Sequence, residues 1–390
     1  MAILAFAYAC DPGEGSEPGA GWDWVRLLAS LDETIVITRA NNASVIQHHL
    51  SRTREKDRIS FVYVDLPPWA RWWKHGGRGV RVYYLLWQVA ALRAARRLGQ
   101  RPDMTWHLTF ANLWLGSLAS LVGGKFVLGP VGGGVAPPVR LLPVLGIRGA
   151  AFEVMRMAAK GIARYVNPLA RVAWRRADLI LVQNRETRAW LPPRYRAKTL
   201  VFPNALGSEA KSASPVERSG TPPVLLMASR LVAWKGGVLA VRVLEQLPEW
   251  RLLICGRGSD ERRMRDLASA IGVSSRIEFR GWVDRRELIR IMREEAHVLV
   301  VPSVREEAGL VVAEAGAAGL PVVCLDRGGP PLLGGYAVAI SSPSRTAAAL
   351  AAAITMARQH GPRVVSTRSE QLLRLQRILR ARGLSTEAMV

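Results

Sequence analysis

Cysteine, acidic residues and long apolar runs are all scarce in this sequence of 390 residues. Its three cysteines, Cys10, Cys255 and Cys324, are too few and too scattered for a disulfide framework or a zinc site, and they suit a reducing compartment. An uncharged run at 108–124 falls just short of a membrane span. Residues 1–10 lack the basic start of a signal peptide and predict a buried strand. We therefore expect a cytoplasmic protein.

The shortage of acidic residues leaves a large positive charge. The chain has 54 Lys and Arg against 31 Asp and Glu, a formal net charge of +23. Residues 1–205 hold 28 of the basic and 13 of the acidic residues, together with 10 of the 13 Trp. Such an excess indicates an anionic partner: nucleic acid, an anionic membrane surface or a phosphate-bearing substrate. Arg-rich coding is the alternative, because only seven of the 54 are Lys.

Short β-branched or apolar runs alternate with longer helical stretches, which is typical of parallel sheets with crossover helices. The first series of predicted strands is 3–8, 34–38, 59–64, 104–108, 126–129, 179–182 and 200–202. The second series is 224–228, 252–255, 277–279, 298–301, 322–325 and 337–340. The pattern predicts an α/β protein with two doubly wound, Rossmann-like domains and a ligand cleft between them.

The domain boundaries follow from a change in composition. Residues 205–223 are small, polar and Pro-containing, which is typical of a linker. We expect an N-terminal domain at 1–204 and a C-terminal domain at 224–362. Residues 363–390 are expected to form a terminal helix, with leucines at helical spacing, that packs back on the N-terminal domain.

The loops that follow two strands of the second half carry groups suited to a phosphate. Arg230 and Lys235 lie where the strand 224–228 gives way to a helix, so two cations stand beside free backbone amides. An ordinary solvated loop is the alternative for this pair. Gly256 and Arg257 follow the next strand in a turn that lets the backbone approach a ligand, although a lone Gly-x-Gly is a weak signal.

Two glutamates stand eight positions apart after the strand 298–301. Glu306 follows the strand and can accept hydrogen bonds from sugar hydroxyls, and Glu314 lies within the next helix and can reach a ribose. Gly309 gives access to the N-terminus of that helix, whose dipole favours a phosphate. A helix cap for Glu306 and an exposed helical position for Glu314 are the alternatives.

In this order, the segments SRLVAWKGG, LLICGRG, IEFRGWVD, VLVVPSVREEAGLVVAEAGAAGLPVV and DRGG resemble the donor domain of retaining glycosyltransferases of family 4, which have the GT-B fold. The resemblance implies that Arg230 and Lys235 hold the diphosphate of the donor. It further implies that Glu306 contacts the donor sugar and that Glu314 contacts the ribose. The donor-binding set expected from it is completed by Gly256, Arg257, Ala308, Gly309 and Leu310; Ala308 stands where many members carry an aromatic residue.

The first half adds three candidates. The segment GSEPGAGW is similar to the Gly-rich loop of one branch of the family, and Gly19 and Gly21 are the positions chosen for close approach to a ligand. His107 ends the strand 104–108; a His there is commonly structural, but family members frequently carry one near the donor sugar. Through the resemblance we expect His107 to orient that sugar.

The positive charge is concentrated in two segments. Residues 69–101 contain eight Arg or Lys and no acid, interleaved with Trp69, Trp72, Trp73, Tyr83, Tyr84 and Trp87, and residues 140–176 contain another eight with Glu153 as their only acid. Cations with interfacial aromatics suit an anionic membrane surface and a lipid-linked acceptor. Solvated helix faces are the alternative. Nucleic acid is not expected, because no nucleic-acid-binding module accompanies the charge.

The sequence thus predicts a retaining, metal-independent glycosyltransferase that moves a sugar from a nucleotide diphosphate sugar to a hydroxyl acceptor. No tightly bound cofactor is expected, and no Asp-x-Asp motif is present for a metal. A UDP-sugar is favoured and GDP-mannose is second. The acceptor would be a lipid-linked or polysaccharide precursor or a natural-product aglycone, and the enzyme would be cytoplasmic and peripheral to the membrane. The alternative is an inactive protein of the same fold that only binds.

Overall fold

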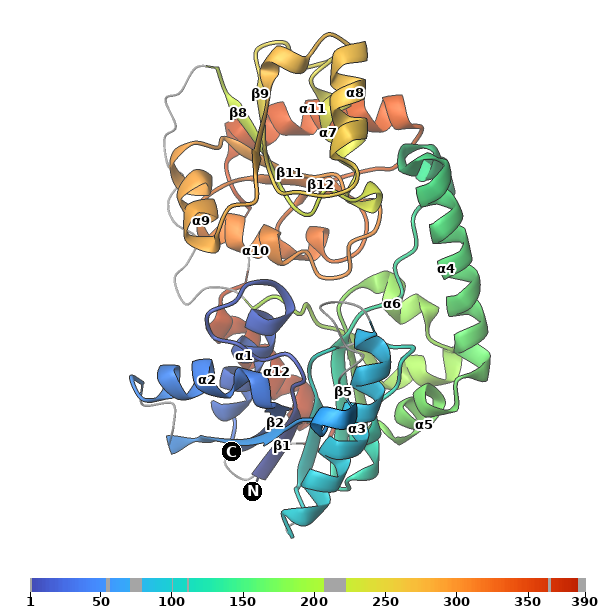
Figure 1. The fold of residues 1–390 in the computed structure, drawn as a ribbon, viewed down its shortest axis with the longest axis vertical. Coiled ribbons are helices and arrows are strands. Elements are labelled where there is room, and N and C mark those ends of the chain that lie inside the picture. The colour runs from blue at the N-terminus through green and yellow to red at the C-terminus, as the bar shows by residue number, and fades with distance from the viewer. Residues whose placement is uncertain are drawn as a thin grey trace. The chain divides into compact units, whose positions relative to one another are not determined.

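The structure, a computed structural model, describes residues 2–53, 57–70, 79–99, 101–110, 112–206, 222–363 and 366–384. The chain forms two compact units (Figure 1). The first comprises residues 1–133, 162–206 and 369–390, and the second comprises 134–161 and 207–368. Both units are therefore assembled from segments that are separated in the sequence.

The described residues of the first unit form a parallel sheet in the order β3-β2-β1-β4-β5-β6-β7. Its strands are β1 Ala2–Phe6, β2 Glu33–Arg39, β3 Ile59–Val64, β4 Met104–His107, β5 Lys125–Val131, β6 Leu179–Val182 and β7 Thr199–Val201. Its helices are α1 Ser16–Ala29, α2 Ala43–Leu50, α3 Val80–Arg97, α5 Pro168–Arg176, α6 Arg185–Trp190 and α12 Arg368–Ala381. Short 3-10 helices lie at η1 Ala40–Asn42, η3 Pro68–Ala70, η4 Leu118–Leu121 and η6 Pro193–Lys198.

Alternating residues of β1 show how this sheet is covered on both faces. Ile3 and Ala5 belong to one core cluster, and Leu4 and Phe6 belong to another, because successive side chains of a strand point to opposite faces. The sheet is thus buried on both sides, as parallel sheets are. The terminal helix α12 adds Leu375 and Leu379 to the first of these clusters. The predicted return of the C-terminal helix to the N-terminal domain is confirmed.

The described residues of the second unit form a parallel sheet in the order β10-β9-β8-β11-β12-β13. Its strands are β8 Val224–Ala228, β9 Arg251–Cys255, β10 Ile277–Gly281, β11 Val298–Val301, β12 Val322–Leu325 and β13 Tyr336–Val338. Its helices are α7 Gly237–Val243, α8 Glu261–Ala270, α9 Arg285–Glu294, α10 Leu310–Ala317 and α11 Pro343–His360, with η5 Val139–Leu145, η7 Ala233–Lys235, η8 Ser274–Arg276 and η9 Pro330–Leu333. The helix α4 Gly146–Val166 begins in this unit.

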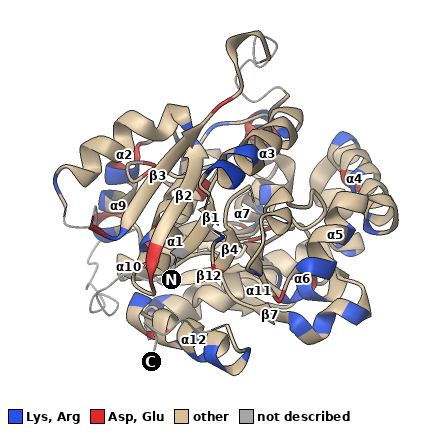
Figure 2. Ribbon diagram, turned by 90° about the horizontal axis from the view of Figure 1, so that it is seen from below, with Lys and Arg blue, Asp and Glu red and all other residues tan. Residues whose placement is uncertain are grey.

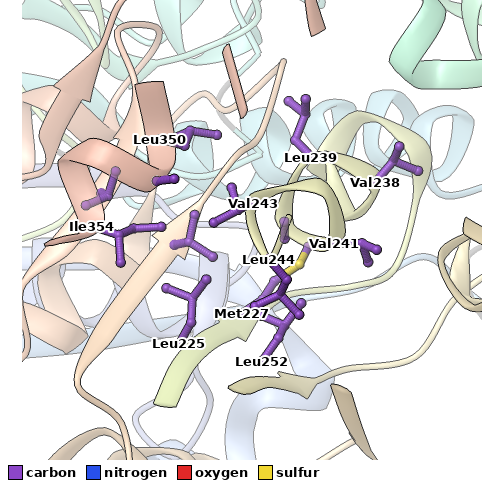
Figure 3. Packing of buried hydrophobic residues seen from close by; sticks show 14 of the residues in the cluster. Leu225, Met227, Val238, Leu239, Val241, Val243, Leu244, Leu252, Leu350 and Ile354 are labelled. Carbon is purple, nitrogen blue, oxygen red and sulfur yellow. The ribbon is translucent and has the colours of Figure 1, made fainter. Parts of the chain in front are cut away.

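The core of the second unit lies between its sheet and the helices α7 and α11. Figure 3 shows Leu225 and Met227 of β8 near Leu252 of β9, with Leu244 and Ile354 above them. Every strand of this sheet pairs in parallel with its neighbours, so all strand ends of one kind lie at one edge. The two doubly wound α/β sheets confirm the predicted fold class.

The aromatic residues of the segment 69–101 are placed differently from our expectation. Tyr83, Tyr84 and Trp87 lie in the core of the first unit, each at most 1% exposed, so they are not interfacial. The physical reason is that α3 turns this apolar stripe to the sheet and its cations outward. Trp69 is exposed, whereas Trp72 and Trp73 lie outside the described residues.

Candidate active site

The two loops singled out in the second half of the sequence meet at the centre of the second sheet. Strands β8 and β11 are neighbours there, although β9 and β10 intervene between them in the sequence. The strand order therefore reverses at this point, which is where open α/β sheets bind their ligands, at the carboxyl ends of the strands. The loop after β8 carries Arg230 and Lys235, and the loop after β11 carries Glu306.

Lys235 and Glu306 form an ion pair between these loops, from Lys235 Nζ to Glu306 Oε2. Both side chains are half-buried, so the pair is partly shielded from water. A backbone hydrogen bond of 3.0 Å from Val304 N to Trp234 O joins the same two loops. Gly236 has a φ of +71°, and a Cβ there would lie 2.1 Å from Pro302 O. Only glycine fits this approach.

Three further candidates, Arg230, Gly256 and Arg257, follow the strands β8 and β9. Arg230 is exposed at the end of β8, and Arg257 is exposed after β9. Gly256 lies so close to the preceding loop that an added Cβ would be 1.8 Å from Ser229 O. Gly256 therefore allows the backbone after β9 to pack closely against the backbone of Ser229. This contact holds the segment that leads to Arg230 in place.

The second glutamate has a partner of its own. Glu314, in α10, accepts a hydrogen bond of 3.0 Å from Arg285 Nε at the start of α9. Gly309 caps α10 with a φ of +77°, Ala308 precedes it, and Leu310 is the first helical residue. The structure thus brings Lys235 and Glu306 together. Glu314 lies about one turn into α10, where it forms an ion pair with Arg285.

Sequence reasoning missed a cluster of charged residues that lies behind the loop of Glu306. Glu153 of α4 is 1% exposed and forms ion pairs with Arg156 Nε at 2.8 Å and with Arg305 at 2.9 Å. The guanidinium of Arg305 also lies over the ring of Trp234, 4.6 Å from its centroid. Arg305 thereby connects three elements: α4, the loop of Lys235 and the loop of Glu306.

Two further residues complete this charge cluster. Lys160 of α4 is 3% exposed and donates to Val135 O at 3.3 Å, and Val135 N donates to Glu307 Oε1 at 3.1 Å. Burial, reinforced by the charge of Arg156, lowers the pKa of Lys160 to about 8. Burial also lowers the pKa of Arg305. The only signal in the sequence was a single acid, Glu153, within a strongly basic segment.

The candidates of the first unit lie after β1 and at the end of β4, and these two strands are neighbours at the reversal of that sheet. Gly19 and Gly21 are in the first turns of α1 rather than in a loop. A Cβ on Gly21 would lie 2.1 Å from Ala9 O, and one on Gly19 would lie 2.3 Å from Glu14 O. Both glycines therefore allow close packing of the chain against itself.

His107 is 3% exposed and both of its ring nitrogens have partners in the first unit. Nδ1 lies 3.0 Å from Ser117 Oγ, and Nε2 lies 3.3 Å from Tyr84 Oη. In the neutral ring one nitrogen donates and the other accepts. Burial lowers the pKa of His107 to about 4, so the ring is neutral at neutral pH.

This buried histidine predicts a loss of stability in acid. Between its ordinary pKa of 6.5 and the folded value of about 4, the unfolded chain binds a proton that the folded chain does not, so the free energy of unfolding falls as the pH falls. The loss is roughly 3 kcal/mol once the pH reaches the folded pKa. Urea unfolding at about pH 7 and about pH 4.5 measures it. The His107→Gln variant should lose less over the same interval; an equal loss in both proteins contradicts the assignment.

The second half of the chain is similar to a known protein family. Residues 209–361 match the family model described as Glycosyl transferases group 1. The chain is 38% identical over 147 residues to the D-inositol 3-phosphate glycosyltransferase of Xylanimonas cellulosilytica, covering 36% of this chain and 35% of that protein. It is 28% identical over 224 residues to the GDP-mannose-dependent alpha-(1-6)-phosphatidylinositol monomannoside mannosyltransferase of Mycolicibacterium smegmatis, covering 51% and 58%. These matches span less than two thirds of either relative.

Solved structures resemble nearly the whole chain. Anabaena Alr3699/HepE, solved in complex with UDP and glucose, has a TM-score of 0.57 at 17% identity and covers 98% of this chain and 100% of its own. The sucrose-phosphate synthase of Thermosynechococcus elongatus has a TM-score of 0.60 at 17% identity, covering 99% and 100%. At this identity the likeness shows the fold, which is GT-B. The match of residues 209–361 to the group 1 glycosyltransferase model accords with the resemblance predicted from the sequence.

Across the residues that are described, no group of three or more His, Cys, Asp or Glu side chains is placed to hold a metal ion. In the same residues, no helix combines the length and the apolar character needed to cross a bilayer.

Proposed function

We propose that this protein is a retaining glycosyltransferase that moves a sugar from a nucleotide diphosphate sugar to a hydroxyl acceptor. The observation that carries the proposal is the ion pair between Lys235 and Glu306 at the reversal of the second sheet. A cation and a carboxylate side by side at that place suit a nucleotide diphosphate sugar. The cation can bind the departing diphosphate, and the carboxylate can bind the sugar from which the diphosphate departs. The donor then binds to the second unit, and the acceptor binds to the first.

The proposed roles follow from the charge of each group. Arg230 and Lys235 stabilise the negative charge that develops on the leaving diphosphate, and the amides at the start of α10 add to this. Glu306 accepts hydrogen bonds from the sugar hydroxyls, and Glu314 does so from the ribose. The binding of a diphosphate to Lys235 would release Glu306 from its ion pair and leave its oxygens available to the sugar.

The proposed reaction needs no base from the protein. The bond between the anomeric carbon and the diphosphate oxygen breaks, and the acceptor oxygen forms its bond to that carbon on the same face. The leaving phosphate oxygen takes the proton of the acceptor hydroxyl. Cationic side chains and a helix dipole take the part of a metal ion, which accords with the absence of an Asp-x-Asp motif. His107 would orient the sugar only if it exchanged one of its present hydrogen bonds.

A UDP-sugar is the favoured donor, and GDP-mannose is the second choice. Alr3699/HepE was solved with UDP and glucose, which supports the first, and the name of the mycobacterial relative refers to GDP-mannose, which supports the second. We also propose a cytoplasmic enzyme that contacts an anionic membrane surface through its basic segments, with a lipid-linked precursor among the candidate acceptors. A natural-product aglycone or a polysaccharide precursor is the other candidate.

A melting-temperature panel tests the proposal. The full chain is heated with UDP, GDP, ADP or TDP, and one nucleotide should raise its melting temperature while the others do not. The matching nucleotide sugar is then assayed for hydrolysis and transfer. If no nucleotide raises the melting temperature, the donor site is refuted; if one does but no sugar is released or transferred, the chain is a binding protein of the same fold.

A further inference from the structure

The helix α4 is amphipathic in the opposite sense to a normal surface helix. Its two buried residues are both charged, Glu153 and Lys160. Its exposed side chains include Ile147 at 91% and Met155 at 64% exposure, and the exposed large apolar residues along it are Ile147, Phe152, Val154, Met155, Ile162, Tyr165 and Val166. A helix in a water-facing position normally turns these two faces the other way.

The spacing of these residues puts them on a continuous stripe. Positions 147, 151, 154, 158, 162 and 165 follow the period of an α-helix, and each of them is exposed and none carries a charge. The charged positions 153, 156 and 160 lie on the other side, where they form the cluster with Arg305. The inner contacts therefore determine the orientation of the helix, and they leave the apolar stripe uncovered by the described residues.

The segment that carries the stripe is basic, and Figure 2 shows its Lys and Arg in blue along α4 and α5. Residues 134–177 are all described, and their only acidic residue is the buried Glu153. Arg140 precedes the helix and Arg148 lies in its first turn, and both are exposed. Val139, next to Arg140, is 76% exposed. An apolar surface bordered by Arg and free of exposed carboxylates matches a bilayer with anionic headgroups.

We propose that the outward face of α4 docks on an anionic lipid bilayer, with its apolar stripe at the boundary of headgroups and acyl chains and with Arg140 and Arg148 on lipid phosphates. A second copy of the chain fits this face poorly, because two such faces would bring arginines together with no carboxylate to pair them. This inference deepens the membrane contact of the proposed function and rests on it. It requires neither a particular donor nor catalysis.

Vesicle flotation of the full chain tests the docking face. Wild-type protein is mixed with vesicles of phosphatidylcholine alone or of phosphatidylcholine with phosphatidylglycerol, at low and at high salt. It should float with the anionic vesicles and lose much of this binding in high salt. The double variant Ile147→Glu, Met155→Glu should bind the anionic vesicles about tenfold more weakly, because it places two carboxylates on the exposed apolar side of α4.

A matched double variant controls for added charge alone. Met356 in α11 and Leu373 in α12 are also exposed, at 41% and 57%, so Met356→Glu with Leu373→Glu makes the same change elsewhere and should float like the wild type. The melting temperature and its shift by the nucleotide that the wild type binds confirm folding of each variant and test the donor site separately. The proposal is overturned if the wild type does not prefer anionic vesicles or if the α4 variant floats as well as the wild type. A dimer without lipid that the α4 variant dissociates, measured by sedimentation, would assign the face to a second copy instead.

Discussion

Replacing Lys235 by alanine is expected to lower the rate of sugar transfer by about 10²- to 10³-fold. Two effects add in this variant. The diphosphate loses a cation where its negative charge develops, and the half-buried carboxylate of Glu306 loses its ion pair and repels that charge. We expect the affinity for the nucleotide to fall as well, because the diphosphate is already charged in the ground state. Calorimetric titration with the nucleotide and steady-state transfer assays measure both quantities.

The matched control for this variant is Arg262→Ala. Arg262 also lies in the second unit, in α8, but it is 93% exposed and its nearest carboxylate, Asp266, is 3.8 Å away. Exposed pairs of this kind contribute little, so the control should bind and turn over like the wild type. Wild-type nucleotide affinity in the Lys235→Ala variant would refute the assignment of Lys235 to the diphosphate.

Replacing Glu153 by alanine is expected to destabilise the second unit by about 3–5 kcal/mol. The variant removes the 1%-exposed carboxylate that pairs with both Arg156 and Arg305, and it leaves these cations and Lys160 crowded together away from water. The loops of Lys235 and Glu306 should loosen together, since Arg305 joins them. Hydrogen exchange of the amides of β8 and β11 during a urea titration reports on the second unit separately.

Glu245→Ala provides the comparison for this change. Glu245 pairs with Arg242 at 3.8 Å, and both side chains are more than one third exposed. Its removal should cost at most about 1 kcal/mol, because exposed ion pairs contribute little. Equal destabilisation by the two variants would mean that the charge cluster around Glu153 does not hold the second unit together.

Most of the fold could be predicted because parallel strands buried on both faces leave a strong signal. All thirteen predicted strands are present among the described residues, and only their ends differ: the strand expected at 126–129 is Lys125–Val131, and that at 337–340 is Tyr336–Val338. Strand ends depend on hydrogen bonds with neighbouring strands, which a single sequence does not specify. That Lys235 and Glu306 lie at the same edge of the sheet accords with the motifs, because both follow strands that a parallel sheet aligns there, but their ion pair was not predicted.

The charge cluster behind the site could not be predicted, for a physical reason. Glu153 and Arg305 are distant in the sequence, and nothing in the periodicity of α4 says that its charged side faces inward. Hydrophobic periodicity defines two faces of a helix, and the usual assumption buries the apolar one. In α4 the charged side faces inward instead, because Glu153 has cationic partners there. The same limitation applies to Tyr83, Tyr84 and Trp87, whose burial on α3 was hidden by the basic residues before and after them in the segment.

The division of each unit into separate segments has a consequence for the order in which the protein can fold as it is synthesised. Glu153 leaves the ribosome long before Arg305 exists to neutralise it, and the first core stays open until Leu375 and Leu379 have been added. Multidomain chains commonly complete their N-terminal domain during translation. In this chain the first unit includes residues 369–390 and the second extends to residue 368, so neither can be completed until those residues have emerged.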